Sequence, residues 1–196
     1  MGLIKRAGDL VYTFRFLTLL VTPFDKTKAY EAGIIDENGK RNRDFDKDAN
    51  REAYKEYYTP FHRLVFNVKR LMAKAPGGSS RLASYAAALF LIKEKYSVSE
   101  KKILKSMEEI GIDPTDILAE ENNWFVLESG QLSPGIYKIR YEKVIDPYDI
   151  TILPQDKVRV AENAMPVGEM FGINIYEATH IRSKQKVYVT SLELLR

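Results

Sequence analysis

The chain has 196 residues, a formal net charge of +3, a hydrophobic fraction of 45% and no cysteine. The apolar content suffices for a buried core, and the lack of cysteine excludes disulfides, thiolate metal ligands and a cysteine nucleophile. Residues 1–75 contain 15 Lys and Arg against 10 Asp and Glu. Acidic residues interrupt the basic ones throughout, so the chain lacks the single-sign field of a strong nucleic-acid binder.

The first predicted element is a helix over residues 3–21. Apolar residues spaced by three and four give it one face, formed by Leu3, Ala7, Leu10, Val11, Phe14, Leu17 and Val21. Phe16, Leu19 and Leu20 widen this face, so we expect burial on more than one side. The longest apolar run in this helix, residues 16–21, is much shorter than a membrane span, and no signal-peptide cleavage site follows it. We therefore expect a soluble protein without a membrane partner.

The next segment reads as a short helix followed by a turn. Thr22 and Pro23 are typical of an N-cap and a first helical position, and Gly33 is typical of a helix end. Asn38-Gly39 is a strong signal for a tight hairpin turn. We therefore predict a helix that ends near Ala32 and an inserted β-hairpin at about 33–44.

A long helical pattern resumes at residue 51 and continues to residue 74. Thr59-Pro60 interrupts it, because proline lacks a backbone donor and disfavours helix at the preceding residue. We expect a kink there or a new helix capped by Thr59. Beyond it, Phe61 to Met72 carry an apolar stripe, and the polar residues lie largely off that stripe.

Further helices are predicted at 81–96 and 100–110, with a last helical turn ending near residue 121. Composition then changes to short β-rich segments separated by turn residues, predicted as strands at 124–128, 136–142, 149–153, 157–161, 172–180 and 186–190. The final residues, 191–196, read as a terminal helical turn. The predicted fold class is α+β, with a helical domain over 1–122 and a small SH3-like β-barrel over 123–196.

Two histidines, His62 and His180, are the candidate general bases. Neither accompanies a nucleophile-elbow motif, and a half-buried structural histidine is the favoured reading of each. The pair does not form a zinc motif, and the acidic turns at 36–39 and 44–48 lack the spacing of a calcium loop. We expect no catalytic residue, no metal and no cofactor.

Basic residues supply the remaining candidates. A possible basic contact face comprises Lys40, Arg41, Arg43, Arg63, Lys69, Arg70 and Lys74. Tyrosines at 54, 57 and 58 lie near it in sequence, and cations interleaved with aromatic residues can contact a phosphate backbone. Arg81, after the glycines of 75–80 at a helix start, is a possible anion site. The favoured reading of the basic face is a solvated helix face or a charged protein interface, and that of the glycine segment is a flexible connector.

Three phrases of the sequence carry a resemblance: "AGDLVYTFRFLTLLVTPFDKTKAYEAGIIDENGKR", "YTPFHRLVFNVKRLM" and "GGSSRLASYAAALFLIKEKY". Together they cover roughly residues 7–96. This part of the chain resembles a group of proteins encoded by tailed bacteriophages with contractile tails, some grouped with virion or head-assembly genes. The resemblance brings no catalytic residue to this chain and implies a virion or assembly role.

The sequence therefore favours a non-enzymatic phage structural or virion-assembly protein that binds other proteins of the particle. It would act in the host cytoplasm during assembly or within the virion. The alternative is a nucleic-acid-binding phage protein that uses the basic helix and hairpin. An enzyme would require a pocket around His62, a perturbed pKa of this histidine and a carboxylate partner.

Overall fold

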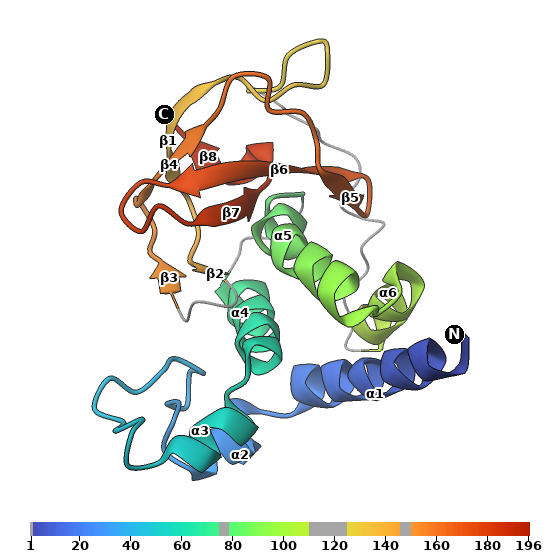
Figure 1. Cartoon of the computed structure of the whole chain (residues 1–196), viewed down its shortest axis with the longest axis vertical. Coiled ribbons are helices and arrows are strands. Elements are labelled where there is room, and N and C mark those ends of the chain that lie inside the picture. Colours follow the sequence, from blue (N-terminus) through green and yellow to red (C-terminus); the bar gives the residue numbers. More distant parts are fainter. Residues whose placement is uncertain (1, 75–78, 110–124, 146–149) are drawn as a thin grey trace.

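The computed structural model describes residues 2–74, 79–109, 125–145 and 150–196, and only the backbone of residues 2–10, 74 and 79–85. Helices occupy the N-terminal half and a curled antiparallel sheet occupies the C-terminal half, in which it forms a half-barrel (Figure 1). The α+β class is thus confirmed. The predicted boundary near residue 122 lies outside the described residues.

The helical half consists of four long and several short helical segments. Their bounds are α1 Gly2–Val21, η1 Phe24–Lys26, α2 Lys28–Glu31, α3 Arg51–Tyr57, α4 Pro60–Lys74, α5 Ser79–Tyr96 and α6 Glu100–Glu108. The break at Thr59-Pro60 is confirmed, since α3 ends at Tyr57 and α4 begins at Pro60. The Thr59 hydroxyl accepts the His62 backbone N–H at 3.4 Å and so caps the new helix.

The N-cap predicted at Thr22 is wrong. The Thr22 hydroxyl donates back to the carbonyl of Thr18 at 2.7 Å, so this residue closes α1. Thr27 performs the capping role instead, because its hydroxyl accepts the backbone N–H of Tyr30 at 3.3 Å at the start of α2. Gly33 follows α2 with φ +72°, as predicted for a helix end.

The sheet is built from short strands: β1 Gly135–Ile139, β2 Lys143–Ile145, β3 Ile150–Ile152, β4 Lys157–Val160, β5 Gly168–Met170, β6 Ile173–His180, β7 Lys186–Val189 and β8 Leu194–Leu195. The main sheet has the order β5-β6-β4-β1-β8, with β7 also paired to β6, and every pairing is antiparallel. Strands β2 and β3 form a separate two-stranded sheet.

Several predicted strands shift or shrink. The strand predicted at 124–128 is represented by one isolated bridge, between Val126 and Leu132. The predicted terminal helical turn is a 3₁₀ turn, η3 Ser191–Glu193, and it leads directly into β8. In the predicted hairpin at 33–44, a single antiparallel bridge joins Ile35 and Arg41.

Helix α5 connects the two halves of the molecule. Its buried residues share one apolar cluster with α1, α4 and α6 and with Met170 and Ile175 of the sheet. Figure 1 shows α5 directly beneath the sheet. The Phe90 ring packs on Gly168, where an added Cβ would lie 2.4 Å from Cε2 of that ring. A glycine at the start of β5 therefore allows α5 to approach the sheet closely.

Candidate functional site

Five of the predicted basic residues line one pocket of about 380 Å³. Lys40, Arg41 and Arg43 come from the segment after α2, and Arg63 and Arg70 come from α4. The rest of the wall comprises Tyr58, Glu142, Val144, Thr151 and Leu153. We refer to this hollow as the basic pocket. Glu142 is the one carboxylate among these lining residues, so their formal charge is five positive against one negative.

The two arginines of α4 are buried rather than solvated. Arg63 is 5% exposed and Arg70 is 7% exposed. They are seven residues apart, which is about two helical turns, so both side chains leave the same face of α4. The expectation of a solvated basic helix face is therefore wrong for these two positions, and the helix presents them to a concave site.

Arg70 joins three separate parts of the chain. Its Nη1 donates to the carbonyl of Gly39 at 2.5 Å, and its Nη2 donates to Glu142 Oε1 at 2.8 Å. Asn67, also buried, donates to the backbone carbonyl of Glu142 at 3.3 Å. The helix, the 36–40 turn and the segment before β2 are thus held together by charge-assisted and neutral hydrogen bonds.

The turn that carries Lys40 has a defined backbone. Asp36 Oδ1 accepts the backbone N–H groups of Asn38 at 2.9 Å and Lys40 at 2.8 Å. Gly39 has φ +71°, and its backbone lies against the Phe24 ring, where an added Cβ would be 2.3 Å from Cε1. The Asn38-Gly39 signal therefore marks a real tight turn, and glycine is required there for both conformation and space.

The other predicted basic residues lie elsewhere. Lys69 Nζ donates to the carbonyl of Thr22, lies 3.5 Å from that of Leu19, and sits 4.5 Å from the Phe24 ring centroid. Burial lowers the pKa of Lys69. This cation satisfies carbonyl groups at the end of α1, where positive charge is favourable. Lys74 ends α4 and Arg81 lies in the first turn of α5, but their side chains are outside the described atoms.

Helix α1 carries a second surface feature, an apolar stripe that faces solvent. Val11 is 51% exposed, Phe14 is 71% exposed and Val21 is 50% exposed. These positions belong to the face that the sequence pattern predicts as the core face, and that expectation is wrong. Phe16 and Leu20, on the opposite side, are the buried residues of the described part of the helix. The helix is apolar around most of its circumference, and the chain covers one side of it.

His62 is a half-buried residue of the α4 N-terminus. Its Nδ1 lies 2.7 Å from the Thr59 hydroxyl, and its ring centroid lies 6.5 Å from that of Phe61 and 6.1 Å from that of Phe66. Burial, with a smaller effect of the Arg15 charge, lowers the pKa of His62 to about 4. The imidazole is therefore neutral at neutral pH and supports the cap of α4. The sequence prediction did not pair His62 with Thr59, although the spacing of three residues at a helix start could have indicated this pair.

The low pKa of His62 predicts a pH dependence of stability. Above about pH 6.5 the ring is neutral in both the folded and the unfolded chain. At lower pH the unfolded chain binds a proton that the folded chain rejects until its pKa near 4 is reached. The free energy of unfolding should therefore fall by about 2 kcal/mol between pH 7.5 and pH 5 through this residue. Chemical denaturation at both pH values measures it.

The control for this prediction is His62→Asn, whose side-chain amide can still bond the Thr59 hydroxyl. Its free energy of unfolding should depend less steeply on pH between 7.5 and 5 than that of the wild type. His180 and the carboxyl groups are present in both proteins, so their contributions cancel in the difference. An equal pH dependence in the two proteins would contradict the assignment.

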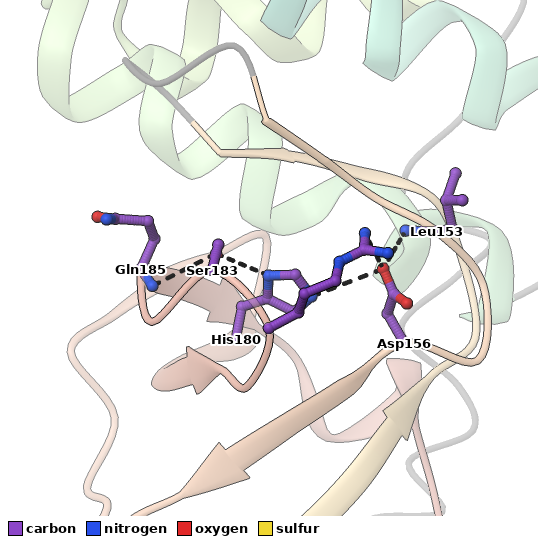
Figure 2. A network of polar contacts seen from close by, with 6 residues as sticks. Leu153, Asp156, His180, Ser183 and Gln185 are labelled. Atoms are coloured by element: carbon purple, nitrogen blue, oxygen red, sulfur yellow. Dashed lines mark hydrogen bonds and ion pairs between the residues drawn. The ribbon is translucent and has the colours of Figure 1, made fainter.

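His180 lies in a polar network at the end of β6 (Figure 2). Its Nδ1 is 2.7 Å from Ser183 Oγ, and its Nε2 is 3.6 Å from Asp156 Oδ2. The same Asp156 oxygen accepts the backbone N–H of Leu153 and Arg182 Nη2, each at 3.0 Å. The order Ser, His, Asp resembles a hydrolytic set, but His180 is only 1% exposed, so a substrate does not reach its ring.

We therefore interpret the His180 network as structural. The backbone N–H of His180 donates to Gln185 O at 2.9 Å, and the Ser183 hydroxyl accepts the Gln185 N–H at 3.4 Å. Burial is the main cause that lowers the pKa of His180, against the opposing effect of Asp156. The neutral ring thus bonds Ser183 in the turn after β6, while its Nε2 lies near Asp156, in the turn before β4, without a hydrogen bond to it.

The described atoms contain no candidate for a metal site or a membrane span. In this part of the chain, no three or more His, Cys, Asp or Glu side chains gather as metal ligands would. None of the described helices combines the length and the apolar character that a membrane span needs. No family model, curated protein or solved structure matches the chain. The basic pocket and the apolar stripe of α1 are therefore the features from which a function is argued.

Proposed function

We propose that this chain is a non-enzymatic bacteriophage structural or virion-assembly protein that binds other proteins of the phage particle. The observation that carries the proposal is the apolar stripe of α1, formed by Val11, Phe14 and Val21. The resemblance of residues 7–96 to contractile-tailed phage proteins supplies the class of partner.

The stripe has the character of a protein contact. Single exposed apolar residues are common, but these three lie on one face of a helix, and grouped exposed apolar residues mark interaction surfaces. Phe14 is the most exposed of the large apolar residues in the described part of the chain. An aromatic side chain at the centre of a helix face is a typical interface anchor. A partner groove would bury the side of α1 that this chain leaves open.

Mass spectrometry of purified particles and proheads tests the proposal. We expect the wild-type protein in one of these particles, and Val11→Gln with Phe14→Gln should reduce its amount at least about tenfold. Burial of a Val or Phe side chain contributes about 1.5–3 kcal/mol, and 1.4 kcal/mol is a factor of ten in affinity. Glutamine is a good helix former, so α1 should stay folded.

The matched control is Met165→Gln with Val167→Gln, which also replaces two exposed apolar residues but lies outside α1. This variant should be incorporated like the wild type. If the wild-type protein is absent from both particles and proheads, and deletion of its gene leaves assembly normal, the proposed function is wrong.

Nucleic-acid binding is the second candidate, and it now depends mainly on Lys40, Arg41 and Arg43. These residues lie together at the basic pocket, and Lys40 and Arg43 are exposed. A salt-dependent mobility shift with duplex DNA tests this candidate, since phosphate contacts weaken as salt rises. Failure to bind at low salt removes it.

For the C-terminal half we propose an SH3-like barrel as the fold type. The strands β1, β4, β6 and β7 follow one another in space, and β8 returns to pair with β1. A 3₁₀ turn precedes β8. This antiparallel order supports the proposal, and strands β2, β3 and β5 are additional to it. The bridge between Ile35 and Arg41 similarly supports an inserted hairpin at 33–44.

A further inference from the structure

We propose that the basic pocket binds a small ligand that carries two or more phosphate groups, such as a nucleoside di- or triphosphate. The inference does not depend on the proposed assembly role. It is based on the observation that five cationic side chains from two separate segments line the basic pocket, which has a volume of about 380 Å³.

Charge balance is the first argument. Glu142 is the single acid among the lining residues, and its Oε1 is already bound to Arg70 at 2.8 Å. The lining therefore keeps a formal excess of four positive charges. Clefts lined by one sign of charge attract ligands of the opposite sign, so this lining favours an anionic ligand such as a polyphosphate.

Donor geometry is the second argument. Guanidinium groups bind phosphate oxygens with two parallel hydrogen bonds, and three arginines line the pocket. Arg70 is fixed by Gly39 and Glu142, so its position is set before any ligand arrives. Lys40 and Arg43 are the exposed cations of the lining, and we refer to them as its rim. Because Arg70 is already fixed, it loses little conformational entropy on binding, whereas the ligand must order the two rim side chains.

The uncharged wall is the third argument. Val144, Thr151 and Leu153 come from β2, β3 and the residue after β3, and together with Tyr58 they offer apolar surface and two hydroxyl groups. Small-molecule sites combine such surface with a few polar groups in volumes of about 300–1,000 Å³. The phosphates would contact the cations, and the organic part would contact this wall.

Isothermal titration of the full chain with inorganic pyrophosphate and with ATP tests the proposal. We expect saturable binding of both at one site. Lys40→Gln with Arg43→Gln should weaken both at least about tenfold, because charge-assisted hydrogen bonds are lost. The matched control is Lys138→Gln with Lys157→Gln, which removes two exposed cations outside the pocket and should change affinity less than about twofold.

The outcomes are distinguishable. Saturable binding of pyrophosphate and ATP that the rim variant weakens and the control variant keeps supports the site. No binding of either probe overturns it, and so does binding that both variants weaken equally. Binding of duplex DNA without binding of either small probe also overturns it and favours the nucleic-acid candidate. Incorporation into particles is a separate measurement, so either proposal can fail alone.

Discussion

Replacement of Glu193 by alanine is expected to lower the free energy of unfolding by about 3–5 kcal/mol, a typical cost of breaking a buried ion pair. Glu193 lies in η3 and is 0% exposed. Its Oε1 is 2.5 Å from Lys143 Nζ, and its Oε2 accepts the Thr190 backbone N–H at 2.7 Å. Without the carboxylate, the buried Lys143 ammonium and the Thr190 N–H lose their partner. Urea denaturation measures the loss.

Lys143→Met probes the same pair from the other side. Burial raises the pKa of Glu193 in the wild type, and the Lys143 charge opposes that rise. In the variant the opposing charge is gone, so the folded pKa rises further above the unfolded value. Such a group stabilises the folded chain at low pH and loses that contribution as pH rises through the folded pKa. The free energy of unfolding of Lys143→Met should therefore lie below that of the wild type, and the difference should be larger at pH 8 than at pH 5.

Glu193→Gln separates charge from hydrogen bonding. Its amide oxygen can still accept from Thr190, so it should lose less than Glu193→Ala does. A free energy of unfolding for Glu193→Ala within about 1 kcal/mol of the wild type would show that the pair does not hold this end of the sheet. The Glu193 carbonyl also accepts the Arg140 N–H at 2.9 Å beside the β1–β8 pairing. We therefore expect the loss of stability to affect this pairing as well.

Three local signals in the sequence predicted the local structure, although the cap predicted at Thr22 did not. Thr59-Pro60 marks the start of α4, and Gly33 follows α2 in the left-handed conformation. Asn38-Gly39 lies in a tight turn. Each of these features depends on proline geometry, a side-chain cap or a positive φ, and all three are properties of a few adjacent residues.

The orientation of α1 could not be predicted in this way. Its apolar residues lie on both sides, so periodicity alone does not decide between the face with Phe14 and the face with Phe16. The choice is made by α4, α5 and α6, which share an apolar cluster with Phe16 and Leu20. Local patterns could not predict β8 either, because its two residues pair with β1, more than fifty residues earlier in the chain.

The sequence predicted which basic residues form the candidate site, but it did not predict that they line a pocket. The sequence selects Lys40, Arg41, Arg43, Arg63 and Arg70, and the structure brings these five to one pocket. Charge led to the expectation that the α4 arginines are solvated. Both are buried, and the partners of Arg70, Gly39 O and Glu142, come from positions 31 and 72 residues away. No local pattern marks Glu142 as the counter-charge.

Replacement of Arg70 by methionine is expected to cost about 3 kcal/mol of folding free energy, while Arg43→Met should change it by less than about 0.5 kcal/mol. Methionine keeps the length of the side chain but removes the bonds to Gly39 O and Glu142. The carboxylate of Glu142 and the carbonyl of Gly39 are then left without this donor. Arg43 is exposed, so its replacement is the matched control for loss of a pocket cation.

Arg70→Lys tests whether geometry or charge is decisive. Lysine keeps the positive charge but concentrates its donors on one nitrogen, so it cannot reach Gly39 O and Glu142 with separate groups as the guanidinium does. We expect it to recover less than half of the loss seen for methionine. Full recovery by lysine would mean that a positive charge alone holds α4, the 36–40 turn and the segment before β2 together. Partial recovery would mean that the arginine fork sets the shape of the basic pocket as well as its stability.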